Sequence, residues 1–243
     1  MHNQDSYERP DTLSQALELL AGSSPRIAAG CTDLFPATER KSLPGPVLDV
    51  TGITELRGIS LGPTGLRIGA TTTWSDIARA DLPPALDGLK LAAREVGASQ
   101  IQSRGTIAGN LCNASPAADG VPPLLTLEAE VELQSTAGLR RIGLDAFITG
   151  PRQTARRADE LLTAIHVPAT ALRGDSHFLK LGARRYLVIS IAMTAARLRI
   201  ENGVVAEAAL AIGACGPVAT RLAEAETAIT GHPLDPARIT DAV

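Results

Sequence analysis

The sequence predicts an α+β protein, α/β-like at its start, with a longer first part and a shorter second part. Segments with apolar residues at helical spacing alternate with short β-rich segments, and a polar, turn-rich stretch at 168–175 separates the two parts. With 243 residues the chain is long enough for one large domain or two modest ones. We expect domains at 1–172, with subdomains of about 1–50 and 51–172, and at 173–243.

One helix and two strands are expected in the first subdomain. Thr12 and Gln15 have the spacing of a capping box, and Gly22 stands where a C-cap glycine would end the helix. Strands are expected at 26–29 and 47–50. This order makes an opening α/β unit.

A hairpin, two helices and three further strands are expected in the second subdomain. Glycines and a proline provide the hairpin turn. The expected elements are strands at 56–59 and 66–70, helices from Thr73 and over 86–96, and strands at 131–135, 140–144 and 161–167. Between Gly97 and Pro123 regular periodicity fails, and a long irregular segment inside a compact domain is usually functional.

The second part is expected to alternate strands and helices, at 177–181, 187–198, 204–212 and 219–230. Its first helix rests on the longest apolar run of the chain, Leu187 to Ala196. This run has ten residues, about half the length that a bilayer requires. The polar N-terminus lacks the order of a secretion signal. We therefore expect no membrane span and a cytoplasmic location.

Composition argues against a nucleic-acid partner. The net charge is −3, so no basic field attracts a polyphosphate backbone. One Trp, two Tyr and three Phe could hardly assemble a surface for stacking bases. The apolar fraction of 44% with 20% charged residues is that of an ordinary globular protein.

The sequence shows no metal site and no catalytic residue. Cys31, Cys112 and Cys215 are odd in number and widely spaced, which fits neither a disulfide framework nor a zinc or iron–sulfur ligand set. We expect them to be small buried thiols. The four histidines show no metal spacing and no paired nucleophile.

Two segments of small residues, 27–34 and 104–113, are the candidate functional sites. Each contains Gly, Thr and Asp or Asn where the chain enters or leaves regular structure. Small residues let backbone N–H groups approach an anion closely, so two such bends could hold the two phosphates of one pyrophosphate. Asp33 would repel a phosphate unless its carboxylate turns away, for example to cap a following helix. Since neither segment is a G-x-G-x-x-G or G-x-x-x-x-G-K-[ST] motif, glycines that merely satisfy turn geometry stay an alternative.

A resemblance to a known family makes the site more specific. The segment 29–34, A-G-C-T-D-L, resembles the A-G-G-T-D-L loop of the FAD-binding subunits of molybdenum hydroxylases, the family of the xanthine dehydrogenase flavin domain and the carbon monoxide dehydrogenase medium subunit. The segment 106–110, T-I-A-G-N, resembles the T-I-G-G-N loop of that family, and 114–119 is similar to the A-x-P-x-x-D that follows it. Two family glycines are replaced, by Cys31 and Ala108. We expect the backbone path to survive if neither position needs a positive φ.

The resemblance implies a two-part FAD-binding domain of the PCMH type, followed by a small α+β C-terminal domain. It implies FAD as the cofactor, and a molybdopterin large subunit and a [2Fe–2S] small subunit as partners. Electrons would pass from the partner's clusters through FAD to NAD, oxygen or a quinone, so this chain would need no catalytic acid or base. A free-standing FAD-dependent oxidase or dehydrogenase, and a non-catalytic module that has lost flavin, remain alternatives.

The resemblance also assigns residues to the cofactor. Asp119 would accept a hydrogen bond from a sugar or ribityl hydroxyl, Leu162 would lie against the isoalloxazine, and Lys180 would stabilise negative charge on the reduced ring. The alternatives without the family are a helix cap for Asp119 and a surface lysine for Lys180, while Leu162 is core-like in either case. The full set is Ile27, Ala28, Ala29, Gly30, Cys31, Thr32, Asp33, Leu34, Val96, Thr106, Ile107, Ala108, Gly109, Asn110, Asn113, Asp119, Leu162 and Lys180.

Overall fold

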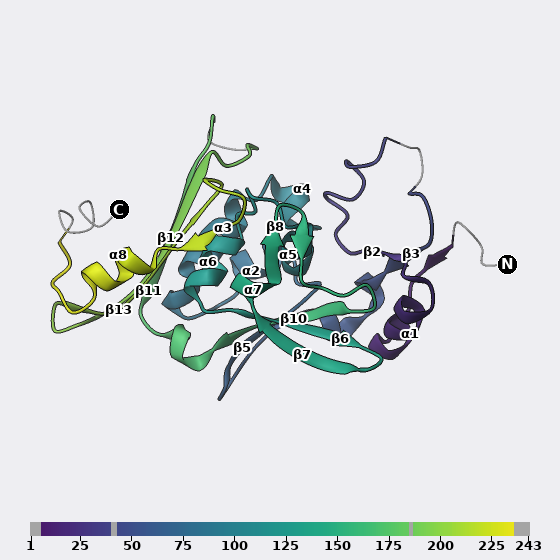
Figure 1. Ribbon diagram of the computed structural model, residues 1–243, viewed down its shortest axis with the longest axis horizontal. Coiled ribbons are helices and arrows are strands. Elements are labelled where there is room, and N and C mark those ends of the chain that lie inside the picture. The colour runs from purple at the N-terminus through teal and green to yellow at the C-terminus, as the bar shows by residue number, and fades with distance from the viewer. Residues whose placement is uncertain (1–5, 40–42, 185–186, 236–243) are drawn as a thin grey trace.

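Three main sheets lie side by side in the computed structural model, which describes residues 6–39, 43–184 and 187–235. In Figure 1 a small N-terminal sheet with α1 lies at the right, a central sheet lies at the bottom, and a C-terminal sheet stands at the left. Most helices lie above the central sheet, between the other two sheets (Figure 1). The mixed α/β architecture agrees with the predicted fold class.

The N-terminal unit is a parallel sheet of order β1-β3-β2 with one helix. Its elements are β1 (Tyr7–Glu8), α1 (Leu13–Ser23), β2 (Arg26–Ala28) and β3 (Val47–Asp49), followed by 3-10 helices at Val50–Gly52 and Thr54–Leu56. Thr12 caps α1 as predicted, because its side chain accepts a hydrogen bond from the Gln15 amide. The predicted C-cap at Gly22 is wrong: the helix runs on to Ser23, and Ser24 ends it with a φ of 45°.

The central sheet is antiparallel, with the order β4-β5-β10-β6-β7. Its strands are β4 (Ile59–Gly62), β5 (Gly65–Gly69), β6 (Glu130–Ser135), β7 (Gly138–Gly143) and β10 (Leu161–Pro168), with a separate small pair, β8 (Ile148–Gly150) and β9 (Gln153–Thr154). The predicted strand at 56–59 starts too early, because Leu56 closes a 3-10 helix and Gly58 turns the chain with a φ of 108°.

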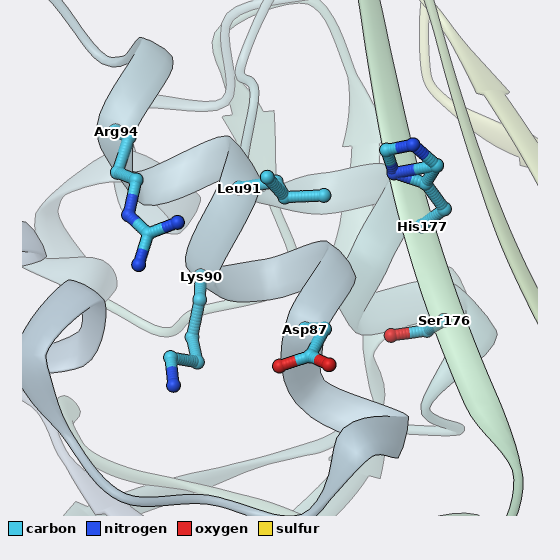
Figure 2. Close-up of a pocket in the computed structure, with 6 residues that line it drawn as sticks. All are labelled: Asp87, Lys90, Leu91, Arg94, Ser176 and His177. Carbon is cyan, nitrogen blue, oxygen red and sulfur yellow. The ribbon is translucent and has the colours of Figure 1, made fainter.

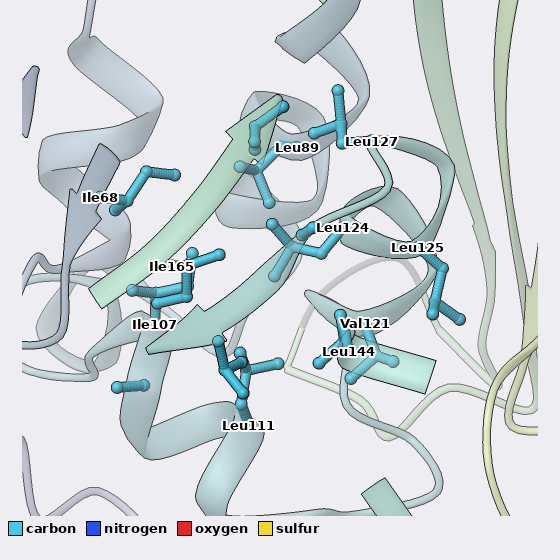
Figure 3. Close-up of a cluster of buried hydrophobic side chains, with 14 of the residues drawn as sticks. Ile68, Leu89, Ile107, Leu111, Val121, Leu124, Leu125, Leu127, Leu144 and Ile165 are labelled. Atoms are coloured by element: carbon cyan, nitrogen blue, oxygen red, sulfur yellow. The ribbon is translucent and has the colours of Figure 1, made fainter. Parts of the chain in front are cut away.

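Helices cover one face of the central sheet and enclose the largest core cluster (Figure 3). They are α2 (Trp74–Arg79), α3 (Asp87–Glu95), α4 (Ser99–Gln102), α5 (Ile107–Asn113), α6 (Val121–Thr126) and α7 (Leu144–Phe147), with a 3-10 helix at Pro84–Leu86 before α3. Figure 3 shows Ile107 and Leu111 of α5 and Leu124 of α6 among these side chains, and all three are fully buried. The stretch predicted to be irregular therefore contains three short helices, each too brief to show a period in the sequence.

The C-terminal sheet is antiparallel, with the order β11-β12-β13-β14. It consists of β11 (Asp175–Leu181), β12 (Ala192–Glu201), β13 (Val204–Gly213) and β14 (Thr220–Arg221), and it follows a 3-10 helix at Ala169–Leu172. The predicted helix at 187–198 is wrong, because β12 pairs with both neighbouring strands. The predicted helix at 219–230 is shorter, since β14 takes its first turn and α8 spans Ala223–Ile229.

Polar side chains fasten the C-terminal sheet to the helices. The guanidinium of Arg197, only 2% exposed, donates to the Thr126 carbonyl at the end of α6 (2.9 Å) and to the Arg173 carbonyl (3.3 Å). The Ser176 hydroxyl accepts from the Gly88 amide at 2.8 Å. These bonds set β11 along α3, so that side chains from both contribute to the site described next.

Candidate functional site

The two predicted bends meet in space. The first bend follows β2, and the second, residues 104–113, leads into α5 and includes it. A Cβ on Gly30 would overlap the Arg104 carbonyl oxygen and come within 2.8 Å of the Gly105 Cα. A Cβ on Gly105 would lie 3.4 Å from Thr32 Oγ1. Only glycine permits this approach of two backbones, so the predicted convergence is confirmed.

The first bend carries the free amide hydrogens. Within the described ranges, the backbone N–H groups from Gly30 to Leu34 donate to no other protein group. They lie outside the ladder of β2 and β3. Successive unpaired amides in a bend form a concavity with positive partial charge, which suits phosphate oxygens. Asp33 is exposed and lies within the turn at 32–37, with no helix directly after it, so the cap considered for it does not exist.

In the second bend, the backbone amides of residues 107–110 donate hydrogen bonds within the fold. Ile107 N–H donates to the Thr72 carbonyl (3.0 Å) and Ala108 N–H to the Ala70 carbonyl (3.3 Å). Gly109 N–H donates to Thr106 Oγ1 (3.1 Å), and Asn110 N–H donates to the Thr106 carbonyl (3.1 Å). The expectation that both bends present amides is thus corrected. Apart from the Thr106 N–H, for which no acceptor is found among the described residues, the second bend can offer an anion or sugar its side chains.

One of those side chains lacks a partner. Among the described residues, Asn110 Oδ1 is buried and accepts no hydrogen bond. It lies beside Gly120, where a Cβ would come within 3.0 Å of it. An unpaired buried acceptor costs about 1–3 kcal/mol, which a ligand hydroxyl would recover. The Thr106 hydroxyl accepts from Gly109, and its own hydrogen remains available to donate.

The two replaced family glycines differ in their backbone conformation. Cys31 has a φ of 59°, in the left-handed region, whereas Ala108 keeps a negative φ inside α5. Cys31 therefore does not meet the condition that neither replaced glycine needs a positive φ. Its left-handed backbone costs about 1–2 kcal/mol. Burial raises the pKa of the Cys31 thiol, and the Arg104 guanidinium lowers it. Of the three thiols, Cys31 is half-buried while Cys112 and Cys215 are exposed, so the expectation of buried thiols is wrong.

Asp119 and Lys180 form a buried ion pair. Lys180 Nζ lies 2.6 Å from Asp119 Oδ2, and both side chains are 7% exposed. Lys180 also donates to the Glu95 carbonyl at the end of α3 (3.3 Å), while Ser190 Oγ donates to Asp119 Oδ1 (2.6 Å). Burial raises the pKa of the Asp119 carboxyl, and the bonds from Lys180 and Ser190 lower it. Asp119 is no helix cap, since Gly120 is the N-cap of α6, and Lys180 is no surface lysine.

The remaining predicted residues lie around this centre. Leu162 is 3% exposed and belongs to the main core cluster, and Val96 is half-buried against the same cluster. The Asn113 side chain and carbonyl both accept from the Arg152 guanidinium. In the first bend Ala28 is buried, whereas Ile27 and Ala29 are half-buried.

Sequence reasoning missed two side chains here, those of Arg104 and Ser190. Arg104 is exposed beside the first bend and pairs with no carboxylate among the described residues. Arg104 opens the segment 104–113 that the sequence singled out, so its charge next to small residues could have indicated it. Ser190 lies in the segment predicted as a helix, so no pattern pointed to it.

A separate pocket of about 440 Å³ lies between α3 and β11. Figure 2 shows Asp87, Lys90 and Arg94 on the helix, Ser176 and His177 on the strand, and Leu91 pointing toward the strand. None of these residues was predicted as a site. The described ranges contain no group of three or more His, Cys, Asp or Glu that could hold a metal, and no helix long and apolar enough to span a membrane.

The chain is similar to known FAD-binding proteins along nearly its whole length. Residues 3–170 match the model "FAD binding domain in molybdopterin dehydrogenase", and residues 177–243 match "CO dehydrogenase flavoprotein C-terminal domain". The xanthine dehydrogenase FAD-binding subunit of Escherichia coli is 34% identical, over 95% of this chain and 80% of that protein. The nicotinate dehydrogenase FAD-subunit of Eubacterium barkeri is 33% identical, over 93% and 79%. A carbon monoxide dehydrogenase structure from Hydrogenophaga pseudoflava matches with a TM-score of 0.89 and 28% identity, covering 100% of this chain and 86% of that one.

Proposed function

Because this chain belongs to the family of FAD-binding subunits of molybdenum hydroxylases, we propose that it takes electrons from iron–sulfur clusters of a partner and passes them through FAD to NAD, oxygen or a quinone. Its cofactor is FAD, and it is part of an FAD-dependent oxidoreductase. When bound, FAD accepts and releases the electrons, while the protein supplies orientation and electrostatics. The proposal concerns the electron acceptor and the route of the electrons.

The residues present fit FAD. We propose that the amides from Gly30 to Leu34 hold its diphosphate, with Thr106 donating and Asn110 accepting hydrogen bonds from the cofactor. The observation that carries this assignment is the row of unpaired amides packed against the second bend. Arg104 adds a positive charge beside that row, which opposes the charge of Asp33.

The ring is proposed to lie toward Lys180 and Asp119. Gly120, the residue after Asp119, packs against Asn110 of the second bend, so the ion pair adjoins the proposed diphosphate site. A buried ammonium there would act on the ring without screening by water. The enclosed side chains of Leu162 and Val96 would supply an apolar boundary at the edge of the core.

Two partner subunits are proposed, one with molybdopterin and one with [2Fe–2S] clusters. Three cysteines cannot supply the four thiolates of one cluster, so clusters must come from another chain. The relatives are named as subunits or medium chains. The domain division at residue 172 and a cytoplasmic location stay predictions.

The test is the composition of the purified full chain and of its native assembly. We expect flavin absorbance at one FAD per chain after reconstitution, and two further subunits in native mass spectra. A chain that holds FAD but purifies only as a homo-oligomer with its own turnover would favour the free-standing enzyme. A chain without flavin bands after soaking in FAD would refute the proposed function.

A further inference from the structure

Ser190 is a buried hydroxyl with a single charged partner. The residue is 7% exposed, and its Oγ donates to Asp119 Oδ1 at 2.6 Å. The other carboxylate oxygen of Asp119 accepts from Lys180 at 2.6 Å. Each oxygen of the carboxylate therefore has one short, charge-assisted hydrogen bond.

Three separate parts of the chain meet at this carboxylate. Asp119 lies between α5 and α6, Lys180 is on β11, and Ser190 lies between β11 and β12. Lys180 is also tied to the end of α3 through the Glu95 carbonyl. The cluster thus links the helical layer to the C-terminal sheet, at the place where Gly120 touches the second bend.

Burial makes the Ser190 bond necessary. A buried carboxylate and a buried ammonium are each costly unless they are paired and their remaining hydrogen-bonding sites are filled. Burial raises the pKa of Asp119 and outweighs the two donors that lower it, so losing one donor would favour the neutral acid further. A neutral or displaced Asp119 would leave the charge of Lys180 uncompensated.

We propose that Ser190 is a positioning residue of the cofactor site, whose hydroxyl holds the Asp119 carboxylate in its pair with Lys180 and so sets the net charge beside FAD. This inference rests on the proposed function. Ser190 itself touches neither substrate nor cofactor in this proposal; it acts through Asp119. Its loss should therefore change the properties of the flavin only while the Asp119 carboxylate is present.

The test is a double-mutant cycle on the full chain reconstituted with FAD, measuring the FAD dissociation constant and the flavin midpoint potential. Ser190→Ala should raise the dissociation constant, by about tenfold at most, because an Asp119 carboxylate that has lost one charge-assisted donor is held less firmly beside the cofactor. It should also shift the midpoint potential upward, because the charge of Lys180 is less well cancelled. In the Asp119→Asn background the same change should alter neither quantity.

Two further variants separate positioning from folding. Ser190→Thr keeps the hydroxyl and should restore both values towards those of the wild type. Ser176→Ala is the matched control, since Ser176 likewise joins the C-terminal part of the chain to the helical layer, at the Gly88 amide, and its printed hydrogen bonds involve neither Asp119 nor Lys180. It should leave the flavin unchanged. Equal effects of Ser190→Ala with and without the Asp119 carboxylate, or equal effects of Ala and Thr at position 190, would overturn the inference while FAD binding by the wild type still stands. A wild-type chain that binds no FAD would instead refute the proposed function.

Discussion

The backbones of Gly30 and Gly105 are in contact: a Cβ on Gly30 would come within 2.8 Å of the Gly105 Cα. This contact joins the N-terminal unit to the helical layer and sets the first bend, with its unpaired amides, against the second. A side chain at position 30 must push the two bends apart. A substitution at this contact therefore tests the proposed diphosphate site directly.

Gly30→Ala should abolish FAD retention. The added methyl group displaces the amides by more than a hydrogen bond tolerates, and we expect at least about a tenfold loss of affinity, since one charge-assisted bond is worth about that much. Flavin absorbance after gel filtration measures it. Gly22→Ala is the control, because nothing lies within 4 Å of its Cβ position and α1 should gain about 0.5–1 kcal/mol. Stoichiometric FAD in Gly30→Ala would contradict the assignment of the bend.

Cys31→Gly should be tolerated, and Cys31→Val should not. The φ of 59° strains any L-residue and is worst for a β-branched one. Glycine removes a cost of about 1–2 kcal/mol but loses about 0.5–1 kcal/mol through greater freedom of the unfolded chain, so a gain of at most about 1.5 kcal/mol is expected. Urea unfolding compares the three proteins. A valine variant as stable as the wild type would show that the strain is absent.

Lys180→Met should lower both stability and the flavin midpoint potential. It leaves the Asp119 carboxylate buried without its cation, which costs about 3–5 kcal/mol, and it removes positive charge near the ring. Combining it with Asp119→Asn should recover much of the stability. A potential equal to that of the wild type would place Lys180 away from the flavin.

Arg197→Met should destabilise the fold by about 2–4 kcal/mol. This guanidinium supplies the Thr126 and Arg173 carbonyls with donors and faces Glu128 and Glu207 at 3.2 and 3.5 Å. Thermal unfolding should show the loss. Arg199→Met is the comparison: Arg199 also pairs with Glu207 but its side chain is 23% exposed, so about 1 kcal/mol or less is expected. Equal losses would mean that burial of Arg197 is unimportant.

Glu160 should make the protein sensitive to acid. Two hydrogen bonds from Arg140, at 2.6 and 2.8 Å, and one from the Arg157 amide hold the pKa of this carboxyl below its usual range. The stabilisation is fully present above the unfolded-chain pKa of about 4.3 and is lost as the pH falls through the lower folded value. Glu160→Gln should be less stable at neutral pH and lose less on acidification. Urea midpoints between pH 7 and about pH 3, with the exposed Glu224→Gln as control, test this; parallel curves would contradict it.

Local patterns predicted well wherever an element leaves a signal in its own residues. The Thr12 and Gln15 pair predicted the start of α1, and the glycines around Thr64 predicted the turn between β4 and β5. The ten-residue apolar run from Leu187 misled, since such a run suits a buried strand as well as a helix. This run leads into a strand in the structure, where β12 pairs with both β11 and β13. A central strand forms backbone hydrogen bonds on both sides.

The chain by itself determined the two small-residue bends, and the family motif that they carry determined FAD as the cofactor. Spacing could not show that Gly30 meets Gly105 or that the amides of residues 107–110 are used within the fold while those of 30–34 are not. Nor could it show that Lys180 pairs with Asp119. These contacts depend on which groups from distant segments hydrogen-bond and pack against one another in the folded chain. Only the tertiary structure decides these contacts, because buried polar groups form hydrogen bonds with whichever groups the fold brings next to them.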